Sequence, residues 1–288
     1  MSEFPLSIFT NSHEALEFRR KFPRPNVEQL LNAHADHMLD GNIILGVNPL
    51  DNAPAEIKIN ENLRNPLLAL GDSGAGKTGL LMTAALSLEL AHTLWGTDEA
   101  ASYAVVTTRQ QEWQSYRLSH NEGVFLPESR ELADYLSDLT DERKSDVRPL
   151  TVLFLDGIEG LLTLSYKNLY QILPTEYTHS EMIPKEPLSY DRTRKMLVEV
   201  LTKGQKYGVL SVATYNTDSP EHGDEQWLPY FHDRIFGRIN QYETAQSLLH
   251  HKYTREDHAK SLGSLMGGGT FAYFRAGEAS PFWTPVIS

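Results

Sequence analysis

The sequence predicts an α/β protein whose mostly parallel sheet carries helices on both faces. From residue 65 onward, short apolar segments of strand type alternate with helical segments, which is the order that produces a parallel sheet. The segment 150–156 is apolar almost throughout, as expected for a strand that is buried on both faces. A glycine-rich turn at 71–78 lies between the first of these strands and the helix that follows it.

This turn, GDSGAGKT, fits the phosphate-binding pattern G-x-x-x-x-G-K-[ST] at every position. Segment 65–70 before it is strand-like, and segment 78–95 after it is rich in Leu and Ala and lacks proline, which predicts a helix. A chance glycine-rich turn would not be expected in this context. The glycines let the backbone N–H groups curl inward, and the helix N-terminus adds its positive dipole end.

The pattern assigns particular tasks to the residues of the turn. Lys77 is expected to reach the β- and γ-phosphates of ATP, and Thr78 is expected to bind Mg²⁺. The complete set predicted to bind ATP is Gly71, Asp72, Ser73, Gly74, Ala75, Gly76, Lys77, Thr78 and Gly79.

Composition indicates a soluble globular protein, with 40% apolar and 22% charged residues among 288. No apolar run approaches the roughly 20 residues that span a bilayer, so no direct membrane insertion is expected. The first residues lack the basic start and apolar stretch of a signal peptide. Cysteine is absent, which excludes disulfides and thiolate metal sites. A cytoplasmic protein is the simplest interpretation.

The charge balance bears on possible partners. Acidic residues outnumber basic ones by 38 to 26, giving a net charge of −12. This argues against a large non-specific DNA-binding surface, which needs clustered Lys and Arg. DNA held in a narrow basic channel of an oligomer stays open.

Two regions are expected, an N-terminal helical segment at 1–42 and a main domain at 43–288. Helices are predicted at 12–21 and 26–39, separated by the proline-containing breaker at 23–25. The first region is interpreted as either an adaptor to a partner or a helical flap on the core. Strands at 42–47 and 55–60 are expected to form a small β-hairpin.

The main domain is predicted to continue in a regular order. Strands are expected at 102–108, 124–126, 208–214 and 234–239. A short helix or turn is expected at 109–116, and helices are expected at 129–144, 161–173, 189–203 and 243–250. A long loop is expected at 174–188, and a closing hairpin from 269–275 and 282–287.

Asp156 ends the apolar strand at 150–156. A carboxylate at this end of a strand, beside the threonine of a phosphate-binding turn, is typical of the Walker B position that binds Mg²⁺. Aspartate is also common after strands because it favours turns. The preceding phosphate-binding turn favours the metal-binding interpretation, so Thr78 and Asp156 are the predicted metal ligands.

From Ile43 onward, the order of features resembles the motor domain of the FtsK/HerA class of P-loop ATPases. The segments that carry the resemblance are 45–51, 55–60 and 65–71 before the turn, and 207–214, 234–239 and 267–273 after Asp156. The resemblance implies a RecA-like P-loop NTPase core that hydrolyses ATP with Mg²⁺. It also implies a homo-oligomeric ring or larger motor assembly that translocates DNA or protein. Within the class, the type VII secretion ATPase modules, which move proteins, are the most similar.

Two departures from the family pattern concern hydrolysis. Gly157 stands where the family usually has a catalytic Glu, and the next acid, Glu159, is the candidate for a displaced base. Tyr215 stands where a sensor glutamine is expected, with Asn216 beside it. ATP binding is therefore expected more firmly than ATP hydrolysis.

Motors of this class complete the site with an arginine from a neighbouring subunit, which offsets charge on the transferred phosphoryl group. Arg130 is the preferred candidate by its position, and Arg143, Arg192, Arg194 and Arg234 are the others.

Three functions remain open from the sequence. The first is a motor that hydrolyses ATP in a ring to move DNA or protein. The second is a degenerate nucleotide-binding module with a regulatory or assembly role, motivated by Gly157. The third is a small-molecule kinase, for which the loop at 174–188 is the one hint of a lid.

Overall fold

The computed structural model describes residues 13–21, 23–59, 65–95, 101–114, 120–127, 129–141, 150–158, 187–218, 225–231, 233–249, 256–265, 268–275 and 278–287. The helix expected at 161–173, nearly all of the loop expected at 174–188, and the residues Arg143 and Glu159 lie outside these ranges.

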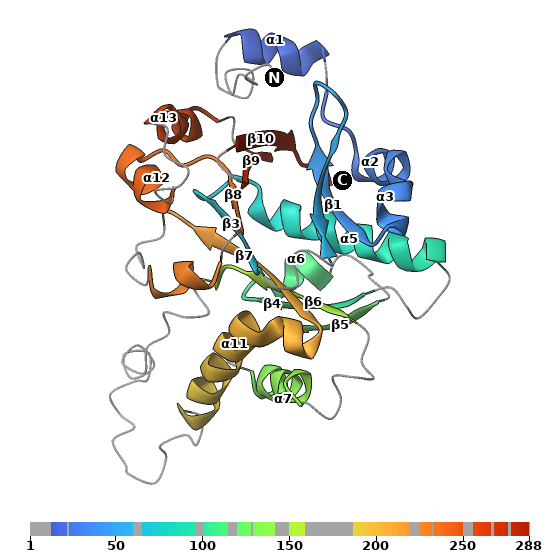
Figure 1. The fold of residues 1–288 in the computed structure, drawn as a ribbon, viewed down its shortest axis with the longest axis vertical. Coiled ribbons are helices and arrows are strands. Elements are labelled where there is room, and N and C mark those ends of the chain that lie inside the picture. The colour runs from blue at the N-terminus through green and yellow to red at the C-terminus, as the bar shows by residue number, and fades with distance from the viewer. Residues whose placement is uncertain are drawn as a thin grey trace.

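The strands join in one mixed sheet (Figure 1). Their bounds are β1 Asn42–Val47, β2 Pro54–Lys58, β3 Leu67–Gly71, β4 Ser102–Thr107, β5 Asn121–Phe125, β6 Thr151–Asp156, β7 Val209–Asn216, β8 Asp233–Phe236, β9 Thr270–Arg275 and β10 Glu278–Trp283. Across the described part of the chain, the strand order is β2-β1-β10-β9-β8-β3-β7-β6-β4-β5.

The sheet has a parallel part and an antiparallel part. From β8 to β5 in this order the neighbouring strands are parallel, whereas β9, β10, β1 and β2 are added in antiparallel fashion. Every residue of β3 and β6 is buried, as parallel strands covered on both faces require. The expected mostly parallel sheet and the expected hairpin of β1 and β2 are confirmed. A closing hairpin also forms, from β9 and β10, but its second strand is Glu278–Trp283 and the expected bounds 282–287 are wrong.

Helices cover both faces of the sheet, as the sequence predicts. Along β6, Val152 and Phe154 belong to one apolar cluster and Leu153 and Leu155 to another, because successive side chains of a strand point to opposite faces. The first cluster includes side chains of α5 (Lys77–Trp95) and α6 (Gln110–Gln114). The second includes side chains of α7 (Arg130–Leu139) and α11 (Pro187–Tyr207), which lie on the other side of the sheet in Figure 1.

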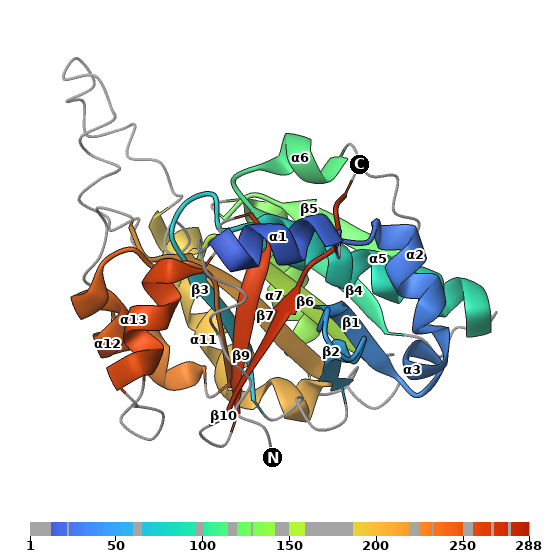
Figure 2. The same cartoon turned by 90° about the horizontal axis from the view of Figure 1, so that it is seen from above.

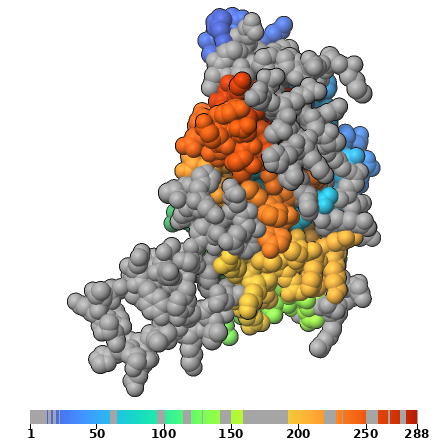
Figure 3. All heavy atoms as spheres, turned by 60° about the vertical axis from the view of Figure 1, so that its left-hand side comes forward, coloured from blue at the N-terminus to red at the C-terminus, as the bar shows by residue number. Residues whose placement is uncertain are grey.

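Two further helices extend the second cluster. α12 (Tyr242–Leu248) and α13 (Glu256–Ser264) pack on each other and contribute Ala245, Leu248 and Leu262 to it. Figure 3 shows α12 and α13 in orange above α11 in yellow. The sequence prediction missed α13 and the 3-10 helix η2 (Glu225–Tyr230).

The N-terminal segment forms three short helices, α1 (His13–Lys21), α2 (Val27–Ala33) and α3 (Ala35–Leu39). The single helix expected at 26–39 is wrong, because the chain leaves helical geometry at His34, whose φ and ψ are −122° and 28°. Leu31 and Met38 are buried against Ile44 and Val47 of β1. Figure 2 shows α2 and α3 beside α5. A domain boundary near residue 42 stays a prediction.

Several element ends differ from the expectation. α7 ends at Leu139 rather than at 144, and α11 extends beyond 189–203 at both ends. β8 ends at Phe236 rather than at 239. Gly237 N still donates to the carbonyl of Leu70 in β3 over 2.7 Å, but the next residue bonds to the glycine-rich turn, where Asp72 N donates to the Arg238 carbonyl over 2.8 Å.

Candidate nucleotide-binding site

The turn at 71–78 joins β3 to α5 at the carboxyl end of the parallel sheet, and a cavity of about 200 Å³ opens above it. Gly74 and Gly76 adopt φ values of 78° and 94°, in the left-handed region that favours glycine. A Cβ at position 76 would lie 2.7 Å from the backbone nitrogen of Gly269. Glycine is therefore required at position 76 for two independent reasons.

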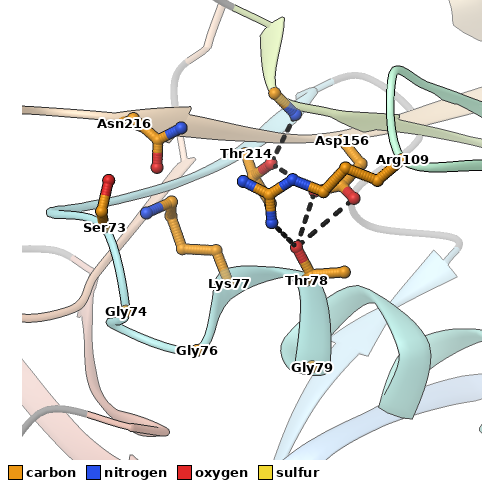
Figure 4. A pocket seen from close by; sticks show the side chains of 11 residues that line it. Ser73, Gly74, Gly76, Lys77, Thr78, Gly79, Arg109, Asp156, Thr214 and Asn216 are labelled. Atoms are coloured by element: carbon orange, nitrogen blue, oxygen red, sulfur yellow. Dashed lines mark hydrogen bonds between the residues drawn. The ribbon is translucent and has the colours of Figure 1, made fainter. Parts of the chain in front are cut away.

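Lys77 is the first residue of α5, and its side chain is buried against its own turn. Its Nζ donates to the carbonyl oxygens of Gly71 over 2.7 Å and Asp72 over 2.9 Å. These neutral carbonyls hold the ammonium group beside the cavity, which Lys77 also lines (Figure 4). The position suits a cation that exchanges carbonyl oxygens for phosphate oxygens.

Asp156 lies at the end of β6 and is 6% exposed, and it is surrounded by donors. The Thr78 hydroxyl donates to Oδ1 over 3.1 Å, and the Thr214 hydroxyl donates to the same oxygen over 3.1 Å. The Trp113 indole N–H donates to Oδ2 over 3.1 Å, and the Thr107 hydroxyl lies 3.4 Å from it. These bonds fix the carboxylate toward the turn.

The oxygens of Thr78 and Asp156 fit a divalent cation. Mg²⁺ prefers hard oxygen ligands and is commonly held by one or two protein oxygens together with water and phosphate. Because the two predicted ligands are in direct contact, a cation between them would have to replace their hydrogen bond. The pairing of Thr78 with Asp156 follows from strand order, since β6 and β3 are separated by β7 alone.

The structure brings together three residues that the sequence analysis did not connect with Asp156, namely Thr107, Trp113 and Thr214. Thr107 ends β4 and is opposite Asp156 in the sheet register, and Thr214 is near the end of β7. Their positions at the carboxyl ends of neighbouring strands could have identified both threonines. Trp113 carried no such signal, because a buried tryptophan on a short helix is ordinarily interpreted as core.

Gly157 adopts a φ of 85°, and its N–H donates to the Thr214 hydroxyl over 2.8 Å. The departure from the family pattern is therefore part of the backbone conformation, because a glutamate at this φ would be strained. Among the described residues that line the cavity, Asp156 is the sole carboxylate.

The sensor position also has a definite arrangement. Asn216 lines the cavity at the end of β7, whereas Tyr215 packs against the apolar cluster on the α11 face. The polar side chain available to a nucleotide at this point is therefore Asn216 and not Tyr215.

Not every residue of the turn faces the cavity. Asp72 is buried, and it accepts hydrogen bonds from the Thr217 hydroxyl over 2.6 Å and from the Asn240 backbone N–H over 2.7 Å. It thus ties the turn to the segments that follow β7 and β8, whereas Ser73, Gly74, Gly76, Lys77, Thr78 and Gly79 line the cavity. Ala75 is also buried.

The predicted arginines fall in different environments. Arg130 begins α7, is exposed, and lies 3.6 Å from Asp134 in an i,i+4 ion pair. Arg192 is exposed on α11 and donates to the Ser137 hydroxyl over 3.2 Å. Arg234 is buried and donates to the carbonyls of Leu228 and Leu248, which leaves it no route to a neighbouring subunit.

Comparisons place this fold among known proteins. No protein-family model matches the chain, and none of the curated proteins compared with it matches. The fold is similar to that of the pCW3 conjugation coupling protein TcpA, in its monomer form with ATPγS. The TM-score is 0.59 at 12% sequence identity, over 86% of this chain and 67% of TcpA.

Two other solved structures show the same similarity. For ATPases 2 and 3 of Thermomonospora curvata EccC, in complex with a signal sequence peptide, the TM-score is 0.56 at 11% identity, over 86% of this chain and 41% of that one. For a structure named as an ATPase, the TM-score is 0.60 at 13% identity, over 92% of this chain and 96% of that one. The chain spans less than half of the EccC structure. The fold of the chain is thus similar to that of TcpA and of these ATPases, in agreement with the fold that the sequence resemblance implies.

Proposed function

We propose that this chain is an ATP-binding motor module of the FtsK/HerA type, which hydrolyses ATP in a ring oligomer to translocate DNA or protein. The observation that carries the proposal is the meeting of Lys77, Thr78 and Asp156 at one cavity above a glycine-rich turn. Lys77 and Thr78 are neighbours in the turn, and Asp156 is brought to them from β6, 78 residues further along the chain. Together they form the combination of cation, hydroxyl and carboxylate that magnesium nucleotides require.

In this proposal each residue has a separate task. Lys77 exchanges the carbonyls of Gly71 and Asp72 for oxygens of the β- and γ-phosphates. Thr78 and Asp156 hold Mg²⁺, which when bound supplies charge neutralisation between the phosphates. Thr107, Trp113 and Thr214 keep the Asp156 carboxylate oriented toward Thr78.

Assembly and cargo are inferred from similar proteins and from charge. TcpA is named as a conjugation coupling protein, and EccC was solved with a signal sequence peptide. These names support a polymer-moving motor for this chain without deciding between DNA and protein. The net charge of −12 favours protein cargo, or DNA contacted by a few residues of a channel. Arg130, exposed at the start of α7, is the proposed residue offered to a neighbouring subunit.

A second candidate is a nucleotide-binding module with little hydrolysis and a regulatory or assembly role. The observation in its favour is the positive φ of Gly157, because the usual catalytic glutamate would be strained at this position. Under the motor proposal, Glu159 supplies the base instead.

Lys77→Ala and Glu159→Gln test both candidates, with Lys195→Ala as a matched control on the exposed surface of α11. Nucleotide affinity, ATPase rate with and without DNA, and oligomeric state are measured for each variant. The motor proposal expects turnover that both substitutions abolish and the control retains. Binding without Lys77-dependent turnover, in monomer and oligomer alike, would favour the second candidate. If nucleotide affinity is unchanged in every variant, including Lys77→Ala, both candidates are contradicted.

A further inference from the structure

Arg109 is a second positively charged residue of the cavity, and the proposal above gives it no task. It follows β4, where its backbone N–H donates to the Thr107 hydroxyl over 2.9 Å. Its side chain is exposed, and its Nη1 donates to the Thr78 hydroxyl over 3.1 Å (Figure 4). Lys77 and Arg109 are the two cationic residues among the described residues that line the cavity.

Arg109 does not support the fold in the way that Arg234 does. Arg234 is buried and bonded to several backbone carbonyls. Within the described part of the chain, the Arg109 guanidinium has one hydrogen-bond acceptor, the neutral Thr78 hydroxyl, and no carboxylate partner. An exposed cation that one neutral group holds at the wall of a cavity is available to an anionic ligand.

The contact with Thr78 places Arg109 beside the residues proposed to hold Mg²⁺. The Thr78 hydroxyl accepts from Arg109 while it donates to Asp156. A guanidinium bonded to Thr78 and a divalent cation held by the same hydroxyl would repel each other, because the repulsion between like charges grows as the distance between them falls. Arg109 therefore has to leave Thr78 when a magnesium nucleotide binds. Phosphate oxygens in the same cavity are its nearest new acceptors.

We propose that Arg109 binds the terminal phosphate of ATP and rests on Thr78 when no nucleotide is bound. This inference rests on the proposed nucleotide site and names the residue of that site that distinguishes ATP from ADP. A guanidinium pairs with phosphate oxygens through charge-assisted and often bidentate hydrogen bonds. With ADP, Arg109 gives up its bond to Thr78 and gains no terminal phosphate in return.

The test compares the dissociation constants of magnesium ATPγS and magnesium ADP, measured by calorimetry on the full chain. Arg109→Ala is expected to weaken ATPγS binding by about 10- to 100-fold, the range for one hydrogen bond to a charged group. ADP binding is expected to stay within about threefold of its original value or become tighter, because a competing contact at Thr78 has been removed. Arg109→Lys keeps the charge without the planar fork and should fall between these limits. Lys195→Ala is the control and should change neither constant.

Each other outcome overturns the inference. Equal weakening of both nucleotides would mean that the substitution damages the turn and not a terminal-phosphate contact. Unchanged binding of both would mean that Arg109 does not reach the phosphates, while the proposed nucleotide site would stand. If the unsubstituted protein binds neither nucleotide, the proposed function fails together with this inference.

Discussion

The indole N–H of Trp113 donates to Oδ2 of Asp156 over 3.1 Å, from a side chain that is 1% exposed. A helix of five residues after β4 thus reaches the carboxylate at the end of β6. Trp113 also stacks on Phe154 of β6, with ring centroids 6.3 Å apart. Core packing and carboxylate orientation depend on the same side chain.

Trp113→Phe keeps most of this packing and removes the donor. We expect the Mg²⁺ concentration that is needed to support ATP binding to rise about tenfold, because groups that orient a metal ligand commonly affect metal affinity by this factor or more. ATP binding without Mg²⁺ should be unchanged. A magnesium titration of nucleotide affinity measures the effect, and Trp283→Phe serves as a buried tryptophan that has no bond to Asp156. Equal losses with and without Mg²⁺ would refute the orienting role.

Gly157→Glu places the family's usual glutamate on a backbone with a φ of 85°. We expect no gain in ATPase rate and a loss of about 1 to 3 kcal/mol in the free energy of unfolding, the cost of a strained backbone residue. Urea unfolding and steady-state turnover measure the two effects. A rise in turnover with unchanged stability would show that the backbone at this position accommodates a catalytic glutamate.

Asp72→Asn removes the charge that the Thr217 hydroxyl and the Asn240 N–H groups bond to. The expected loss is about 1 to 3 kcal/mol in the free energy of unfolding, because buried donors lose a charged acceptor. ATP and ADP affinities should fall together, since the whole turn is loosened. Asp134→Asn, on the exposed side of α7, is the control. A loss confined to ATP would contradict a purely positioning role.

Arg234→Met replaces the buried guanidinium that bonds the carbonyls of Leu228, Phe231 and Leu248. We expect the free energy of unfolding to fall by about 2 to 4 kcal/mol, as for other losses of a buried hydrogen-bond network. Arg130→Ala should cost less than about 0.5 kcal/mol, because its side chain is exposed. If Arg130 is the residue offered to a neighbouring subunit, its variant loses turnover in the oligomer with little change in stability. If Arg130→Ala lowered the free energy of unfolding more than Arg234→Met, the assignment of Arg234 as buried and Arg130 as exposed would be wrong.

His34 provides a prediction on pH. Burial, and to a lesser extent the neighbouring His37, lower the pKa of His34 below its ordinary value of 6.5. Because the unfolded chain binds the proton more readily, stability from neutral His34 is present above pH 6.5 and is lost as pH falls through the lowered pKa. His34→Gln should therefore reduce the loss of stability between pH 7.5 and 5.5, as measured by urea unfolding. An unchanged pH dependence would assign that loss to other groups.

The parts of the site that lie close together in the sequence could be predicted. The sequence pattern of the turn at 71–78 predicts its glycines and the place of Lys77 from adjacent residues. The apolar run of β6 likewise predicts a strand that is buried on both faces. The order of strands and helices then predicted that Asp156 would approach Thr78. The predicted ends at 144 and 239 were wrong. The end of β8 could not be predicted locally, because Arg238 and Asn240 bond to Asp72 of the turn, which is far from them in the sequence.

By itself, then, the sequence determined the fold class, the glycine-rich turn with Lys77 and Thr78, and the apolar strand that ends in Asp156, because each depends on a local pattern of side chains. Tertiary structure alone decided that Trp113 and Thr214 orient Asp156, that Arg109 rests on Thr78, and that Arg234 is buried. These contacts join residues from different strands and helices, so their distances depend on how the sheet is ordered and packed. The positive φ of Gly157 likewise became visible only with the backbone in place.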